Sequence, residues 1–202
     1  MTEAAPPEKR ARPWGLVILL VGGVAVGIAL ALVTSASPPG ADRPAARPGS
    51  YDLPLTVREL QPGQQAPDFA ARTPAGETIR LRDLRGSLVA LNFWATWCEP
   101  CKIEMPELQR AAVRYAGDGL IVLGVNQAEP AAEVQAFMQE HGLTFPTVLD
   151  ADESIADRYG VLGLPTTYWI DVEGVVRAKH IGMLDASLID RYIADLMETR
   201  PG

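Results

Sequence analysis

The chain has little of what metal centres and disulfide-rich scaffolds are built from, because its 202 residues include two cysteines and two histidines. Two cysteines form at most one disulfide, which excludes the framework of bridges that holds small secreted domains together. A structural zinc site needs four ligands. Neither His141 nor His180 stands at a zinc-finger spacing from the cysteine pair. The sequence therefore predicts no metal centre.

Basic residues are also scarce relative to acidic ones. Lysine and arginine number 18 against 25 aspartates and glutamates, which gives a net charge of −7. A nucleic-acid-binding domain is expected to be basic, at least on one face. The charge balance thus disfavours a nucleic-acid partner.

Charge is missing altogether from Trp14 to Val33. Twenty residues at ~1.5 Å each match the ~30 Å hydrocarbon core of a bilayer. Basic residues precede this stretch at positions 9, 10 and 12, and the next one is Arg43, so the positive-inside rule keeps the N-terminus in the cytoplasm. We predict a cytoplasmic tail over 1–13 and a transmembrane anchor over 14–33, with the rest of the chain outside the cytoplasm.

A cleavable signal peptide is the alternative to an anchor, since small residues occur at 35–37. The apolar region of a signal peptide is shorter, ~7–15 residues, which favours the anchor. Residues 34–59 are rich in proline, glycine and alanine and are typical of a linker. We expect one folded domain over 60–199.

The domain shows strands that alternate with helices and then a terminal hairpin and helix, which predicts an α/β fold with a mixed sheet covered on both faces. The strand at 88–95 is apolar almost throughout, as a strand buried on both faces should be. Predicted strands cover 68–72, 77–81, 88–95, 119–126, 145–149, 166–170 and 175–181, and predicted helices cover 99–116, 130–141, 153–159 and 186–198. The positions of helix 99–116 that we expect to face inward are Ile103, Leu108, Ala111, Ala112 and Tyr115.

The two cysteines form the sequence Cys98-Glu99-Pro100-Cys101 where strand 88–95 gives way to this helix. A thiol at a helix N-terminus has a lowered pKa and a larger thiolate fraction, so we predict that Cys98 is the attacking thiol. Cys101, one turn further on, is then the resolving thiol that breaks the mixed disulfide. Pro100 suits the first helical turn. Glu99 favours the helix start yet opposes a thiolate, so the sign of its effect on the reduction potential stays open.

The segment 93–102 resembles the active site of thioredoxin-fold proteins, and the segment 163–167, Gly-Leu-Pro-Thr-Thr, resembles their cis-proline loop. Within that fold the Cys-Glu-Pro-Cys quartet, Glu104, the following Met-Pro pair and the predicted anchor are similar to extracytoplasmic ResA/TlpA-type thiol-disulfide oxidoreductases. The resemblance covers about residues 60–199. It implies a thioredoxin-like fold with an added helix and strand, which 130–149 would supply.

The resemblance also implies the substrate groove. Pro165 would be preceded by a cis peptide, and Leu164 would offer backbone hydrogen bonds to an extended substrate. Trp97, directly before the first cysteine, is expected to border that groove, and we include Glu99 and Pro100 in the substrate-binding surface.

Glu104 matches the acidic residue that the ResA-type branch associates with proton handling. The alternative is an ordinary solvated carboxylate on a helix. Asn92 stands where thioredoxins place a buried aspartate, and an amide cannot carry a proton away. This departure favours the proton-handling role for Glu104.

The resemblance implies a reductant of protein disulfides, with the oxidised CxxCH of apocytochrome c among its substrates and a membrane thiol transporter as electron donor. It implies no cofactor besides the Cys98–Cys101 disulfide. A peroxiredoxin-like peroxidase is one alternative, but the residue seven before Cys98 is Leu91 and not the proline of Pro-x-x-x-Thr-x-x-Cys. A copper chaperone is another, but a histidine near the proline loop would be expected and 160–167 has none.

Overall fold

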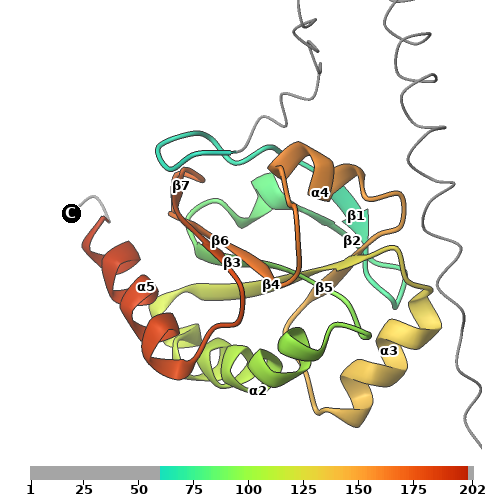
Figure 1. Ribbon diagram of the computed structural model, residues 1–202. Helices are drawn as coiled ribbons and strands as arrows, with labels where there is room; N and C mark the ends of the chain where they lie inside the picture. The colour runs from blue at the N-terminus through green and yellow to red at the C-terminus, as the bar shows by residue number, and fades with distance from the viewer. Residues whose placement is uncertain (1–59, 200–202) are drawn as a thin grey trace, which may run out of the picture. The chain divides into compact units, whose positions relative to one another are not determined.

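A five-stranded mixed sheet organises residues 60–199, the part of the chain that the computed structural model describes (Figure 1). The first three strands of this sheet along the chain run parallel, and the last two are added antiparallel. In spatial order the strands are β5 (Thr147–Asp150), β4 (Leu120–Gln127), β3 (Leu88–Trp94), β6 (Thr166–Ile170) and β7 (Val176–Ile181). The predicted mixed sheet is confirmed.

Helices cover both faces of the sheet, as the alternating pattern predicted. Figure 1 shows α2, α3 and α5 on one face, and α4 with the β1–β2 hairpin on the other. The helices are α2 (Glu99–Arg114), α3 (Ala131–Glu140), α4 (Ser154–Tyr159) and α5 (Ala186–Glu198). The hairpin strands are β1 (Ala70–Arg72) and β2 (Thr78–Arg80), and short 3-10 turns span Leu81–Leu84 and Ala116–Asp118.

Strand β3 lies at the centre of the sheet, and all seven of its residues are buried. Successive side chains point to opposite faces, so β3 contributes to both hydrophobic cores. Leu88, Ala90 and Trp94 join the core under α2 and α5, whereas Val89, Leu91 and Phe93 join the core under α4. Asn92 shares the face of the first group and is the polar residue of this strand.

Most strand boundaries differ from the prediction by one or two residues, and the differences at β5 and at the β1–β2 hairpin have identifiable reasons. The strand predicted at 145–149 begins at Thr147, because Pro146 has no N–H to donate and stands just before the ladder. The hairpin strands are three residues each, and Leu81 already belongs to a 3-10 turn. The added helix and strand expected within 130–149 correspond to α3 and β5.

The prediction that Ile103 faces inward is wrong, since its side chain is 63% exposed. The buried positions of α2 are Cys101, Glu104, Met105, Leu108 and Ala111. A charged residue, Glu104, thus occupies an inward position, and Ile103 lies away from the buried face of the helix. A polar side chain on the inward face, that of Glu104, interrupts the apolar periodicity from which the inward positions were predicted.

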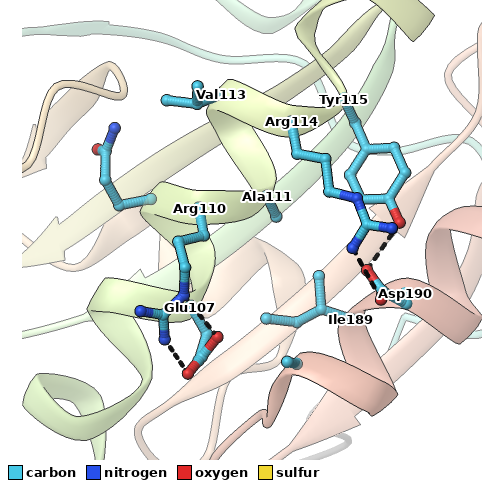
Figure 2. A pocket seen from close by; sticks show the side chains of 10 residues that line it. Glu107, Arg110, Ala111, Val113, Arg114, Tyr115, Ile189 and Asp190 are labelled. Atoms are coloured by element: carbon cyan, nitrogen blue, oxygen red, sulfur yellow. Dashed lines mark hydrogen bonds and ion pairs between the residues drawn. The ribbon is translucent and has the colours of Figure 1, made fainter.

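The end of α2 is tied to α5 by the carboxylate of Asp190 (Figure 2). Its two oxygens accept hydrogen bonds from the Tyr115 hydroxyl at 2.7 Å and from Arg114 Nη1 at 3.2 Å. This contact fixes the C-terminal end of the helix whose N-terminus carries the cysteines.

The predicted tail (1–13), anchor (14–33) and linker (34–59) lie outside the described residues and stay predictions. Within residues 60–199, the helices are too short or too polar to cross a membrane.

The centre of the sheet is tightly packed around Gly124. A Cβ at this position of β4 would lie 2.6 Å from Thr147 Oγ1 and 2.8 Å from Trp94 Nε1. We therefore expect Gly124→Ala to lower the free energy of unfolding by ~1–3 kcal/mol, the usual cost of overpacking, as measured by urea denaturation. Gly117→Ala is the control, because nothing lies within 4 Å of that Cβ. Equal stability of the two variants would contradict this view of the packing.

Candidate functional site

The cysteines form a disulfide at the N-terminus of α2, with Sγ atoms 2.02 Å apart. Cys98 is the N-cap residue of the helix, and its Sγ accepts a hydrogen bond from the Cys101 N–H at 3.3 Å. Cys98 is 5% exposed and Cys101 is fully buried. Pro100 lies in the first turn, where a missing N–H costs nothing. The sequence places the pair here because β3 ends at Trp94 and α2 begins at Glu99.

The proline loop precedes β6, the strand beside β3. The peptide bond between Leu164 and Pro165 is cis, as the resemblance to thioredoxin-fold proteins implied. Thr166 follows directly and pairs with Phe93 of β3, which brings the loop to the same end of the sheet as the turn that leads to Cys98. The carbonyl of Pro165 accepts a hydrogen bond from Gly182 N–H at 2.9 Å.

Three of the predicted substrate-binding residues, Trp97, Glu99 and Pro100, lie on the surface at or next to the disulfide. Trp97 is 67% exposed, an unusual position for so large an apolar side chain. The Glu99 carboxylate is exposed and pairs with Lys102 Nζ at 2.6 Å. Its charge is therefore both solvated and partly neutralised.

Glu104 is fully buried, so the alternative of a solvated helix carboxylate is wrong. Its Oε1 accepts a hydrogen bond from Asn92 Nδ2 at 2.8 Å, and its Oε2 accepts one from the Leu184 N–H at 2.9 Å. Asn92 Nδ2 also donates to Thr167 Oγ1 at 2.9 Å. Glu104 thus joins α2, the central sheet and the segment that leads into α5.

Burial raises the pKa of Glu104 from 4.5 to about 7. Removing a carboxylate from water disfavours its charged form. The hydrogen bonds from Leu184 N–H and Asn92 Nδ2 lower the pKa and offset only part of this effect. A group with a pKa near neutrality can both give and accept a proton at physiological pH.

Sequence reasoning missed the partners of these side chains. It identified Asn92 only as a residue unable to carry a proton, whereas the structure makes it a hydrogen-bond donor to Glu104. The available signal was a polar residue within a buried strand, which must find a partner. It also missed Glu129, whose carboxylate accepts hydrogen bonds from the main chain and side chain of Thr96, two residues before Cys98.

A protein-family model described as the AhpC/TSA family matches residues 62–179. Thioredoxin-like protein YneN of Bacillus subtilis is 45% identical over 128 residues, which are 62% of this chain and 74% of that protein. Thiol-disulfide oxidoreductase ResA of the same organism is 40% identical over 134 residues, 66% of this chain and 75% of its own.

Solved structures show the same likeness. A thiol:disulfide interchange protein of the thioredoxin family from Chlorobium tepidum has a TM-score of 0.62 and 27% identity, and the match covers 69% of this chain and 99% of that one. The fold is therefore thioredoxin-like. Cys98 and Cys101 supply the pair of thiols that disulfide exchange requires.

The raised pKa of Glu104 predicts a specific dependence of stability on pH. Between pH 4.5 and about 7 the folded state holds a proton that the unfolded state has lost, so this stabilisation is complete below pH 4.5 and disappears as the pH rises through about 7. Glu104→Gln removes the titration. We expect the free energy of unfolding of the variant, relative to the wild type, to rise by about 3 kcal/mol from pH 4 to pH 8.

Urea denaturation of both proteins at several pH values measures this difference, in which the titrations of all other groups cancel. A difference that stays constant between pH 4 and pH 8 would mean that Glu104 titrates normally.

Proposed function

Because this chain belongs to the AhpC/TSA family and is a thiol-disulfide oxidoreductase of the ResA type, we propose that it reduces protein disulfides through a dithiol-disulfide cycle of Cys98 and Cys101. The observation that carries the proposal is the cysteine pair at the N-terminus of α2, at the same end of the sheet as the loop of Leu164 and Pro165. The structure holds the oxidised form, which is the product of one turnover.

The cycle transfers two electrons to the substrate in two exchanges. The Cys98 thiolate attacks one sulfur of the substrate disulfide, forms a mixed disulfide and expels the other substrate sulfur as a thiolate, which takes a proton from water. The Cys101 thiolate then attacks Cys98 Sγ and releases the second substrate thiolate. The chain is oxidised to the Cys98–Cys101 disulfide, and the substrate is reduced to two thiols.

Glu104 is proposed to serve the second exchange. Cys101 must lose its proton before it attacks. Because Cys101 is fully buried, bulk water has no direct access to its thiol, and another group must accept the proton. Glu104 lies one turn further along the buried face of α2 and has a pKa of about 7. In its ionised form it accepts the proton of the Cys101 thiol, and Asn92 and Leu184 hold the carboxylate for that transfer.

The substrate is proposed to bind along Trp97, Glu99, Pro100, Leu164 and Pro165. The exposed indole of Trp97 offers an apolar surface next to the sulfur, and the peptide of Leu164 offers main-chain hydrogen bonds to an extended segment, as in strand addition. By likeness to the ResA-type proteins, we propose the oxidised CxxCH of apocytochrome c as one substrate and a membrane thiol protein as the electron donor.

The proposed location rests on the sequence outside the described residues. The apolar stretch at 14–33, preceded by basic residues, supports a single anchor with the N-terminus in the cytoplasm and the domain outside it. An extracytoplasmic position suits a reductant, because disulfides form and persist in that environment.

The roles of the two cysteines are tested by trapping. Cys98→Ala should abolish disulfide exchange, because no attacking thiol remains. Cys101→Ala should accumulate mixed disulfides with substrates, because the resolving thiol is missing. Non-reducing gel electrophoresis of membrane extracts, followed by mass spectrometry, identifies the trapped partners, with the double variant as the control. If Cys98→Ala trapped partners and Cys101→Ala did not, the roles would be reversed.

The direction of electron flow is tested by the reduction potential of the pair, measured by equilibration with glutathione or dithiothreitol. A reductant should lie near the ~−270 mV of thioredoxin. A potential close to the ~−120 mV of strong oxidants would overturn the proposal that the chain reduces its substrates.

A further inference from the structure

One carboxylate, that of Glu129, binds the turn that leads into Cys98. Glu129 follows β4 and precedes α3, and its Oε2 accepts a hydrogen bond from the Thr96 N–H at 2.8 Å. Its Oε1 accepts one from the Thr96 hydroxyl. Asn126 Nδ2 donates to Oε2 at 2.5 Å and holds the carboxylate in place. A single side chain thus satisfies both donors of the residue two positions before Cys98.

Ala128, the residue before Glu129, adopts a backbone conformation that residues with a Cβ disfavour. Ala128 has φ of 54°, in the left-handed region that residues with a Cβ rarely visit. Its N–H donates to the Asp150 carbonyl at 3.1 Å. Strained residues persist only where the surrounding contacts over-determine them, and they cluster at functional sites. The chain departs from regular geometry at the point that brings Glu129 to Thr96.

The position of this turn decides where the Cys98 sulfur lies. Cys98 N–H donates to the Ala95 carbonyl at 3.2 Å, so 95–98 form one closed turn with Thr96 inside it. At the end of this turn Cys98 caps α2 and receives the Cys101 N–H. If Thr96 shifts, the sulfur moves away from the helix N–H groups that stabilise its thiolate.

We propose that Glu129 is a positioning residue for the attacking thiol, because it fixes the 95–98 turn so that Cys98 Sγ stays at the cap of α2. This inference rests on the proposed role of Cys98. It also gives the segment between β4 and α3 a part in the chemistry, since this segment supplies the carboxylate.

A positioning role and an electrostatic role of Glu129 make different predictions for Glu129→Gln. The Gln Oε1 accepts from Thr96 N–H and Asn126 Nδ2, and the Gln Nε2 donates to the Thr96 hydroxyl, which is able to accept as well as donate. The amide therefore keeps all three contacts and removes only the charge. A positioning role predicts that this variant behaves as the wild type does, whereas Glu129→Ala does not.

Asp190 provides a matched control at the other end of the same helix. Figure 2 shows its carboxylate joined to Arg114 and Tyr115. Asp190→Ala also removes a carboxylate with two donors on the flank of α2. If Glu129→Ala acted only by lowering the stability of the protein, Asp190→Ala should therefore change the reactivity of Cys98 in the same way.

The experiment measures the pH dependence of the alkylation of Cys98 by iodoacetamide, in the full chain carrying Cys101→Ala so that one thiol remains. The titratable side chains in the first two turns of α2 (Glu99, Lys102 and Glu104), His180 in β7 and Asp185 at the N-cap of α5 are unchanged in every variant. Thermal unfolding is recorded for each protein.

We expect Glu129→Ala to raise the midpoint of alkylation by about one pH unit, which is tenfold less thiolate at a given pH below the midpoint. Glu129→Gln and Asp190→Ala should leave the midpoint in place, although the latter should lower the melting temperature. Thr96→Val, which removes only the hydroxyl contact, should move the midpoint in the same direction by a smaller amount, and it carries the test if Glu129→Ala does not fold.

A midpoint that stays unchanged in Glu129→Ala, or in Thr96→Val when the first variant does not fold, would overturn the inference and leave Glu129 a structural role. A shift in Glu129→Gln as large as that in Glu129→Ala would also overturn it, in favour of an effect of charge. The proposed function is judged separately, on whether the unmodified chain reduces a disulfide.

Discussion

The burial of β3 on both faces is the constraint on which the rest of the domain depends. All seven residues of this central strand are buried, so the strand is fixed by two cores at once. The chain must leave the sheet at Trp94 and begin α2 at Glu99. The turn between them is short and follows a strand that is buried along its whole length. The reactive sulfur therefore takes its position from the packing of the interior, and precise sites are generally built on such rigid elements.

Two carboxylates flank the thiols and behave differently because their surroundings differ. Glu104 lies in the apolar interior, where two hydrogen bonds compensate its burial incompletely and its pKa rises to about 7. Glu129 lies between β4 and α3, where three donors converge on its oxygens. The first is suited to move a proton, and the second is suited to hold a loop. The same functional group is thus proposed to transfer a proton at Glu104 and to hold a turn in position at Glu129.

The features that the sequence predicted well are local ones. The order of strands and helices, the position of the cysteines at a strand-to-helix junction and the cis-proline loop each depend on a short run of residues. The failures involve contacts between distant positions, such as Thr96 with Glu129, 33 residues apart, or Asn92 with Thr167, 75 residues apart. The misplacement of Ile103 has the same origin, since the inward position beside it belongs to a charged residue whose partners lie on other elements. Hydrophobic periodicity cannot reveal a polar side chain that is buried for its chemistry.

The near-complete burial of Cys98 has a consequence for the selection of partners. A residue that is 5% exposed leaves little of its surface open to an incoming group. A disulfide recessed in a folded protein is therefore poorly placed to reach this sulfur, whereas a thin, unfolded segment can approach it. Under the proposed function, the dithiol would therefore react slowly with the recessed disulfides of folded proteins. The burial of Cys98 would then make the folding state of a partner, in addition to its sequence, a criterion for its reduction.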